Sequence, residues 1–374
     1  GANTFTYGGS ALGILSQTSN VSVSLSNINV PSYGGAPRES IESIKFNAPN
    51  IYRTQGRIVT AADARSVLIA EVTGIDSVSV WGGEDNDPPT YGKIFASLKP
   101  ANADKYGPSQ KNYIINTILK PKSLPIVTYE LVDPDYIYVV VDSQVRYNSG
   151  YTNLTPEGLR QVISSSINRY SEDTLGQFGS YFRYSQLTGV IDAADPSVQS
   201  NLTTVRLEKR LSINTGTSSY TLSYSNPIYQ PDSTSNVVSV TSRVGVQFFT
   251  HRDEAGLLRS TCYVENSGNT LNVYRQTADN EKLLTKANFG TVDFEPGEVA
   301  FTSFSPTNIT TNFISELRIQ AIPRDSDLVP NRNQIIRIPT DGVSVLVVED
   351  LYNRTSTTFG RITAGGRRGA GSFV

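Results

Sequence analysis

The stretch Tyr33–Asp63, YGGAPRESIESIKFNAPNIYRTQGRIVTAAD, contains the local signals that set the start of the fold. Apolar side chains recur at Ile41, Ile44 and Ala48, which is the spacing of one face of a helix. Pro49 is predicted to end this helix, because proline lacks an amide hydrogen and disfavours a helical residue before it. The stretch therefore predicts a helix that begins after a glycine-rich loop and stops at Pro49.

A second helix is predicted to begin directly after this stretch. Thr60 is placed as its N-cap, and Asp63 lies three residues on, as in an acidic variant of the capping box. Its predicted buried face consists of Ala64, Val67, Leu68 and Val72. Gly74 supplies the stop, since glycine readily adopts the left-handed conformation found after helix ends.

Residues 60–147 are predicted to form a first α+β lobe, a small sheet with helices on one side. The strand and helix signals follow in this order: strands at Asp76–Trp81 and Lys93–Leu98, a helix from Ser109, and strands at Ile126–Leu131 and Tyr136–Val145. The last two strands are predicted to form a hairpin around Asp133-Pro134-Asp135. The run Ile137–Val141 is nearly all apolar, which is typical of a central strand covered on both faces.

Four further segments complete the predicted organisation. Residues 1–59 hold an N-terminal strand and helix, with Val21, Val23 and Leu25 alternating with serine on one face of the strand. Residues 148–213 form a second α+β lobe, with a helix capped by Thr155. Residues 214–348 are predicted as an antiparallel β domain, and residues 349–374 as a flexible arm. The predicted fold class is α+β: multi-lobed, with small sheets carrying helices on one side in the first half and a β-rich second half.

The composition limits the classes of function. The formal charge of −2 argues against long-range capture of nucleic acid or of an anionic membrane, and no apolar run approaches a membrane span. With one histidine and one cysteine, a transition-metal site or a histidine-dependent triad has almost no residues to use. Because the chain contains no methionine, it is interpreted as the C-terminal part of a longer polypeptide. We therefore predict a protein that is not an enzyme and needs no cofactor.

Each candidate chemical residue has a structural explanation that is preferred. Glu84, Asp85 and Asp87 share one loop, but their spacing matches no known calcium loop. Asp133 and Asp135 flank a proline, where aspartate is favoured for its local hydrogen bonds. The same preference holds for the lone histidine His251, which is assigned to a strand end, and for Cys262, which is assigned to a strand interior. The arginines of the last 24 residues are interpreted as part of a disordered tail or of an arm that packs on a neighbouring subunit; contact with nucleic-acid phosphate is the alternative.

The stretch Tyr33–Asp63, with Val78-Ser79-Val80-Trp81 after it, resembles the signature of baseplate J-like proteins, the wedge subunits of contractile phage tails and related injection machines. The resemblance consists of a Gly-Gly loop, Glu-Ser opening a helix, Ala-Pro closing it, and Val-Thr-x-x-Asp opening the next helix. Within that family, residues 324–336 resemble the T-even-type wedge protein class (gene product six), of which this chain is similar to the C-terminal part.

This resemblance implies a structural virion protein of the tail baseplate without catalytic residues, cofactor or small-molecule substrate. It implies that copies of the chain form a homodimer and a ring around the tail hub, together with other wedge and hub proteins. The residues that match the motif, interpreted as helix caps and a helix–helix corner, are Glu39, Ala48, Pro49, Arg57, Thr60, Asp63 and Trp81.

A baseplate that switches conformation needs lobes that move about short linkers. Candidate hinges lie in polar, glycine-containing segments, at Ser149 and Gly150 and at Gly216. Two alternatives stay open at this point. One is a tail-associated receptor-binding or glycan-binding protein with a tyrosine-rich β surface; the other is a hydrolase acting on cell-wall polymer, which would need a pair of carboxylates in a cleft.

Overall fold

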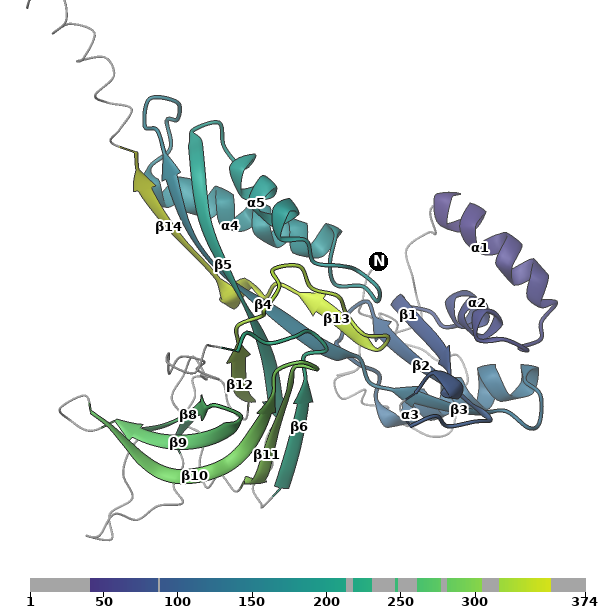
Figure 1. The fold of residues 1–374 in the computed structure, drawn as a ribbon. Coiled ribbons are helices and arrows are strands. Elements are labelled where there is room, and N and C mark those ends of the chain that lie inside the picture. The colour runs from purple at the N-terminus through teal and green to yellow at the C-terminus, as the bar shows by residue number, and fades with distance from the viewer. Residues whose placement is uncertain are drawn as a thin grey trace, which may run out of the picture. The chain divides into compact units, whose positions relative to one another are not determined.

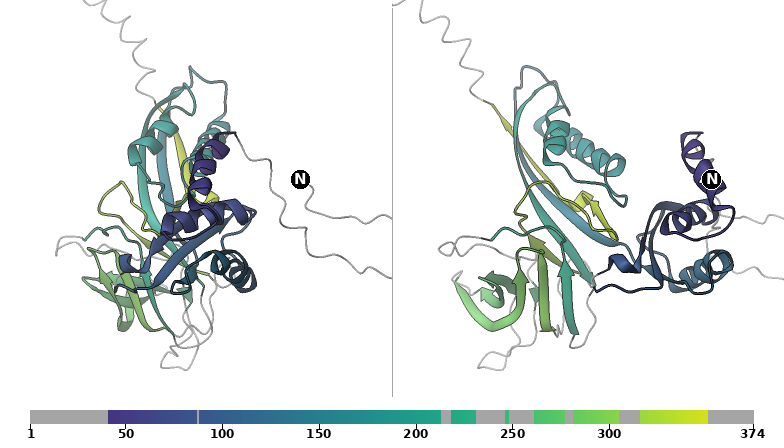
Figure 2. Two further views of the ribbon diagram at one scale, coloured as in Figure 1. Left: turned by 90° about the vertical axis from the view of Figure 1, so that its right-hand side faces the viewer. Right: turned by 45° about the vertical axis from the view of Figure 1, so that its right-hand side comes forward.

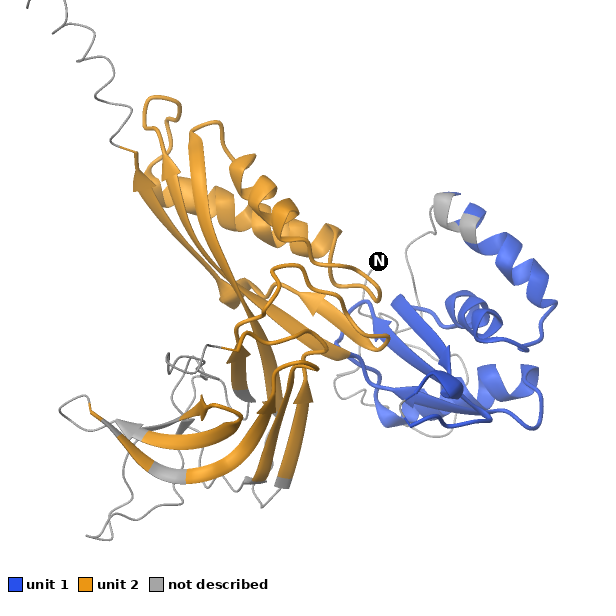
Figure 3. Cartoon of the chain, viewed as in Figure 1, with its two compact units in different colours: residues 1–134 blue, residues 135–374 orange. Residues whose placement is uncertain are grey.

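The computed structural model describes residues 41–86, 88–212, 218–230, 246–247, 261–276, 281–304 and 316–350. The chain divides into two compact units, residues 1–134 and 135–374 (Figure 3). Several predicted features lie outside the described residues: the strand around Val21–Leu25, the loop Tyr33–Pro37, Glu39, Asp87, Gly216, His251 and residues 351–374.

Unit 1 is a three-stranded sheet with helices packed on it. Its elements are α1 (Ile41–Thr54), α2 (Ala61–Glu71), β1 (Ile75–Gly82), the 3₁₀ turn η1 (Gly83–Asp85), β2 (Lys93–Pro100), α3 (Pro108–Tyr113), the π-helical turn η2 (Ile114–Leu119), the 3₁₀ turn η3 (Lys120–Lys122) and β3 (Thr128–Val132). Strand β2 is central, antiparallel to β1 and parallel to β3. The core joins α2 and η2 to the sheet through Leu68, Ile118 and Leu119, with Ala64 and Val67 buried as predicted.

Helix α1 does not stop at Pro49, contrary to the sequence prediction. It continues through Pro49 to Thr54. A proline inside a helix removes one main-chain hydrogen bond and costs stability, but Pro49 lies on an exposed side, where water can satisfy the carbonyl that is released. The chain turns instead at Gln55 and Gly56, whose φ angles of 47° and 73° are left-handed.

The predicted hairpin around Asp133-Pro134-Asp135 is wrong. Strand β3 pairs in parallel with β2, and the next strand, β4 (Asp135–Tyr147), pairs with strands of unit 2. The amide of Asp135 donates to the carbonyl oxygen of Asn333, 2.9 Å away. Consecutive strands with a short connection favour a hairpin, but here the apolar run of β4 is needed as the centre of a larger sheet.

Unit 2 contains two sheets on one continuous core (Figure 1). The elements of the first are β4, α4 (Pro156–Asp173), α5 (Tyr184–Asp192), β5 (Val198–Ser212), β12 (Glu316–Ala321), β13 (Gln334–Arg337), η4 (Thr340–Gly342) and β14 (Val343–Glu349). The strand order is β12-β5-β4-β13, and β14 also pairs with β4. Helices α4 and α5 cover one face of this sheet (Figures 1 and 2). The side chains of Leu159, Ile163 and Ile167 of α4 are fully buried.

The second sheet is antiparallel and has the order β6-β11-β10-β9-β8-β7. Its strands are β6 (Ser218–Ser223), β7 (Val246–Gln247), β8 (Thr261–Ser267), β9 (Thr270–Gln276), β10 (Lys282–Asp293) and β11 (Glu298–Phe304). Phe289 and Phe301 pack with ring centroids 5.7 Å apart. The hydroxyl of the buried Tyr224 donates to the carbonyl oxygen of Ile319 in β12, so the two sheets are joined through their cores.

The predicted α+β class with a β-rich second half is confirmed. The strands are divided among the units and sheets differently from the prediction. The division between compact units falls at 134/135 and not at 147/148. Residues 214–348 do not form a separate antiparallel domain, because β12, β13 and β14 return to the sheet of β4 and β5. Strands β13 and β14 are parallel to β4, a long-range pairing that no local signal encodes.

Candidate assembly surface

The corner between α1 and α2 is built from local hydrogen bonds. The Thr54 hydroxyl donates to the carbonyl oxygen of Ile51 at 2.7 Å, and the amide of Arg57 donates to the carbonyl oxygen of Thr54 at 2.9 Å. Ile58 is then buried and its amide donates to the carbonyl oxygen of Lys122. Of the predicted motif residues, Arg57 lies at this corner, whereas Ala48 and Pro49 lie inside α1 and not at a corner.

Thr60 and Asp63 form the predicted capping box at the start of α2. The amide of Asp63 donates to the Thr60 hydroxyl at 3.2 Å, and the amide of Thr60 donates to a carboxylate oxygen of Asp63 at 3.0 Å. Burial acts to raise the pKa of Asp63, but the hydrogen bonds from Thr60 and Val59 and the charge of Arg53 outweigh it, so this pKa lies below the ordinary value of 3.8.

Asp63→Ala is expected to destabilise unit 1 by about 1 kcal/mol at neutral pH, because it removes a capping acceptor. A lowered folded-state pKa contributes stability above the unfolded pKa, and this contribution is lost as the pH falls through the folded value. The difference in free energy of unfolding between Asp63→Ala and the wild type should therefore become smaller below about pH 4. Urea unfolding followed by fluorescence measures this, since Trp81 is the single tryptophan and lies in unit 1. A difference that stays constant from pH 7 to pH 3 would contradict the assignment.

Trp81 is a structural residue of the unit 1 sheet. Its ring stacks on Phe95 of β2 with centroids 5.9 Å apart, and its Nε1 donates to Oδ1 of Asn86 at 2.8 Å. The following turn is tight, because a Cβ on Gly83 would lie 1.8 Å from the carbonyl oxygen of Thr90. Glu84 and Asp85 are exposed on this turn.

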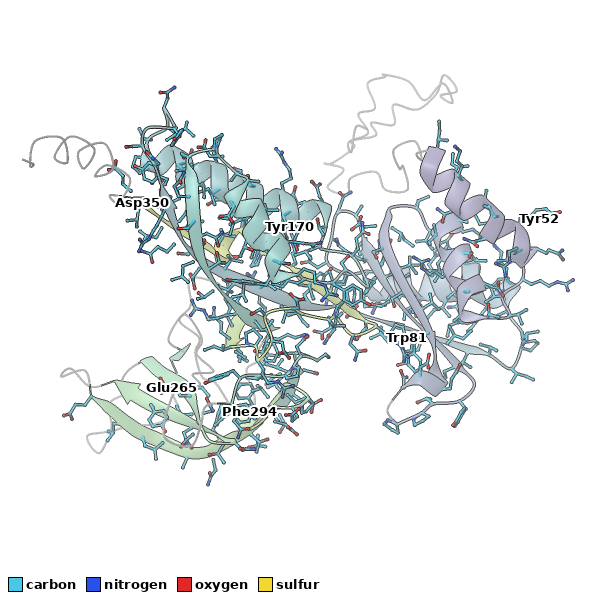
Figure 4. The ribbon with its side chains drawn as sticks, turned by 45° about the horizontal axis from the view of Figure 1, so that its top comes forward. Tyr52, Trp81, Tyr170, Glu265, Phe294 and Asp350 are labelled. Carbon is cyan, nitrogen blue, oxygen red and sulfur yellow. The ribbon has the colours of Figure 1, made fainter. Side chains whose placement is uncertain are left out.

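Helix α1 presents apolar side chains to solvent along one side. Ile41, Ile44 and Ile51 are 68%, 45% and 37% exposed, and Ala48 between them is also exposed. The spacing of these residues, three then four then three, is that of a helix that packs along another helix. Tyr52, labelled in Figure 4, is 82% exposed beside them. We call these five residues the α1 stripe.

The opposite arrangement holds on the side of α1 that is turned inward. Of the α1 side chains that the structure describes, the less exposed are Asn47, Asn50 and Thr54. These are polar and recur at i, i+3 and i+7, so they share one side of the helix. A helix in a self-sufficient unit buries its apolar side. In α1 the apolar side faces outward and the polar side faces inward. This is the arrangement expected of a helix whose apolar side is covered by another molecule.

The end of the stripe could not be expected from the sequence as long as the helix was predicted to stop at Pro49. Ile51 and Tyr52 lie beyond that point, in the segment that the sequence predicts to follow the helix. The signal that finds them is the continuation of the spacing from Ile41, Ile44 and Ala48 to Ile51.

Two of the candidate chemical residues form ion pairs within their own unit. Asp133 pairs with Lys111 at 2.7 Å and Asp135 pairs with Lys209 at 2.6 Å. Among the described residues, no three His, Cys, Asp or Glu side chains gather closely enough to hold a metal ion. Across that same part of the chain, no helix has the length and apolar character needed to cross a bilayer.

The candidate hinge at Ser149 and Gly150 lies in the turn between β4 and α4, both in unit 2. The Ser149 hydroxyl donates to Oε1 of Glu349 at 2.6 Å, and the Gly150 amide donates to Oδ1 of Asn148. Because this turn lies within unit 2, motion at it would not move one compact unit relative to the other. A hinge role for these residues stays a prediction, as it does for Gly216.

A buried ionic cluster in unit 2 was not anticipated from the sequence. Glu208 of β5 is 2% exposed and lies among Arg210, Arg318, Gln320 and Asp341. Arg210 donates to Glu208 at 3.2 Å and to Asp341 at 2.9 Å, Arg318 approaches Asp341 at 2.6 Å, and Gln320 donates to Glu208 at 2.8 Å. The cluster joins β5, β12 and η4. In the sequence, Glu208 and Arg210 alternate with Leu207 and Leu211, which is a pattern typical of a strand with one side facing solvent.

The comparisons with known proteins match both compact units. Residues 60–131 match the family model described as baseplate structural protein gp6, C-terminal domain I, and residues 135–210 match the model of C-terminal domain III of the same protein. These two segments lie on either side of the boundary at 134/135. The matches support the wedge-protein part of the resemblance seen in the sequence, and the baseplate J-like label stays a prediction.

A curated relative is the baseplate wedge protein gp6 of Enterobacteria phage T4. It is 27% identical over 209 residues, which cover 56% of this chain and 31% of the relative. The chain thus spans about a third of the length of the curated relative. Among solved structures, the baseplate of the anti-feeding prophage, determined by cryo-electron microscopy with 6-fold symmetry, matches 47% of this chain and 39% of the other with 20% identity and a TM-score of 0.32.

Proposed function

We propose that this chain is a structural subunit of the baseplate wedge of a contractile phage tail, located in the virion. It meets copies of itself and other wedge and hub proteins, and its contacts build a ring. Two segments similar to the C-terminal domains I and III of a baseplate structural protein support this role. The baseplate J-like resemblance of residues 33–84 belongs to the same proposal.

The observation that carries the proposal is the α1 stripe. Isolated helices of this length are marginal in water, and in proteins they are stabilised by burying an apolar face. In α1, Ile41 and Ile44 face solvent while Asn47 and Thr54 are turned inward. A second surface that covers the stripe removes this apolar area from water. We assign the stripe to contact with a second copy of the chain, as a homodimer.

A relay of the baseplate switch requires a joint between rigid bodies. We assign this joint to Asp133-Pro134-Asp135, where the chain passes from one compact unit to the other. Asp133 is held by Lys111 in unit 1, and Asp135 is held by Lys209 in unit 2. Each side of Pro134 is therefore fixed to its own unit, and rotation at this joint would leave both cores intact.

The test is the mass of the full chain in solution, measured by sedimentation velocity across a range of protein concentrations. We expect a monomer that converts to a dimer as the concentration rises. A chain that stays strictly monomeric at every concentration, also in the presence of its wedge and hub partners, would overturn the proposal.

A further inference from the structure

Strand β14 is an apolar edge strand. Among the residues that the structure describes, it pairs with β4 and with no other strand. Its sequence, VSVLVVE, carries no charge before Glu349. Natural sheets protect exposed edges with charges, prolines, bulges or a covering segment, because free amide and carbonyl groups invite another strand. Over Val343–Val348 the described part of β14 has no charge or proline.

A groove lies beside this edge, between β14 and α4. It has a volume of about 490 Å³. One wall is the outer flank of α4, formed by Arg160, Gln161, Ser164 and Ser165, and the other wall is formed by Val343, Ser344 and Val345. A groove between a sheet edge and a helix is the shape that accepts an extended segment by strand addition. The polar flank of α4 favours small polar side chains on the helix side of such a segment.

The other face of the sheet favours apolar side chains. Leu346 of β14 lies opposite Gln144 of β4, which lies opposite Leu202 of β5. Leu346 and Leu202 are 59% and 68% exposed, and Val348 is also exposed. Every second side chain of an added strand would therefore lie on the same face as Leu346. An apolar side chain directly opposite Leu346 would form a favourable cross-strand pair.

The groove thus specifies an extended segment that alternates small polar residues with apolar ones. A second copy of β14 fits poorly, because its Val345 and Val347 would meet the serines of α4. The segment Val21–Ser26, VSVSLS, has the required pattern: Val21, Val23 and Leu25 fall on one face and three serines on the other. It lies in residues 1–40, which precede the described part of unit 1.

We propose that Val21–Ser26 of a second copy adds as a strand to β14. This inference rests on the proposed function, in which copies of the chain meet. The connection from Ser26 to Ile41 contains the residues 27–40. Fully extended, it spans about 45–50 Å, so the segment can reach a neighbouring molecule. The added strand fills the groove, caps the edge of the sheet and links one subunit to the next.

Disulfide trapping tests the proposal on the full chain. In a Cys262→Ser background, which removes the single native cysteine, one sample carries Leu346→Cys and a second carries one cysteine in residues 21–25. Directly opposed residues on neighbouring strands have Cβ atoms about 4.5–5.5 Å apart. Mixed and oxidised, the Val21→Cys, Val23→Cys or Leu25→Cys chains should form a covalent dimer with the Leu346→Cys chain. The matched Ser22→Cys and Ser24→Cys chains, on the opposite face, should give at least several-fold less.

Three results overturn the inference. Equal yields for all five positions would show random collision, and no yield at any position would show that the segment does not reach β14. A link that forms only when one chain carries both cysteines, and leaves it at monomer mass, would place the segment in its own groove. Sedimentation of the same samples separates this from the proposed function: self-association without the alternating pattern removes only the strand addition, whereas a strict monomer removes both.

Discussion

Replacing Glu208 with alanine is expected to lower the free energy of unfolding of unit 2 by about 3–5 kcal/mol, because it leaves buried charge uncompensated. The side chains of Glu208, Asp341, Arg210 and Arg318 balance to zero charge. Removing Glu208 leaves a net positive charge on guanidinium groups that are 19% and 9% exposed. It also removes the acceptor for Gln320, which is itself buried.

The neighbouring groups tie this cluster to the sheet. Burial acts to lower the pKa of Arg210, but hydrogen bonding to Asp341 and the charges of Asp341 and Glu208 outweigh it and raise that pKa. The Arg210 guanidinium also lies 4.2 Å from the ring centroid of Tyr138 in β4. The packing of β4, β5, β12 and η4 against one another therefore depends on this one cluster of charged side chains.

Glu157→Ala is the matched control for Glu208→Ala. It also removes a glutamate paired with an arginine in unit 2, but Glu157 and Arg160 have side chains 62% and 53% exposed. Surface ion pairs contribute about 0–1 kcal/mol. Urea unfolding is followed by far-ultraviolet circular dichroism, with Trp81 fluorescence as a separate probe of unit 1. The assignment of the cluster fails if the two alanine variants lose similar stability, or if the Trp81 transition shifts as much as the transition of unit 2.

Local chemistry made several elements predictable from the sequence. Thr60 and Asp63 form the predicted capping box, and Thr155 accepts a hydrogen bond from the amide of Gly158 at the start of α4. Strand β4 is a central strand, as its apolar run indicated. Each of these signals acts within a few residues, which is why it is visible in the sequence.

The unpredicted features depend on pairing between distant segments. Strands β13 and β14 return to β4 from about 200 residues further along the chain. The burial of β5 could not be predicted, because the strand carries charged residues. Glu208 is buried on one face of the strand, and Lys209 is buried on the other face, where Lys209 pairs with Asp135. Burial lowers the pKa of Lys209, and the pairing with Asp135 offsets this in part. A strand that buries both faces with charge on each has no periodic signature.

The α1 stripe shows a different limit of sequence patterns. The spacing of Ile41, Ile44 and Ala48 correctly identified one face of a helix, and such a face normally packs on the chain's own core. The structure turns it outward. The spacing of apolar residues identifies the apolar face of the helix, but it does not show whether the chain's own core or another molecule covers that face.

The double substitution Ile44→Asp with Ile51→Asp is expected to weaken self-association of the chain at least about 100-fold. Both side chains are partly exposed in the single chain and would be covered in the dimer. Placing two carboxylates there forfeits the burial of both isoleucines and adds the desolvation of two charges, which an apolar interface does not compensate. The dissociation constant from sedimentation equilibrium is the measurement.

The matched control is Leu124→Asp with Ile126→Asp, which makes the same kind of change in the same unit. Leu124 and Ile126 are 50% and 87% exposed and lie before β3, not on α1. This variant should dimerise as the wild type does. Both variants should keep the urea midpoint of Trp81 fluorescence, because the replaced side chains contribute little to the core of unit 1. Equal weakening by the two variants would show that general surface hydrophobicity drives association, and unchanged dimerisation of the α1 variant would place the homodimer contact elsewhere.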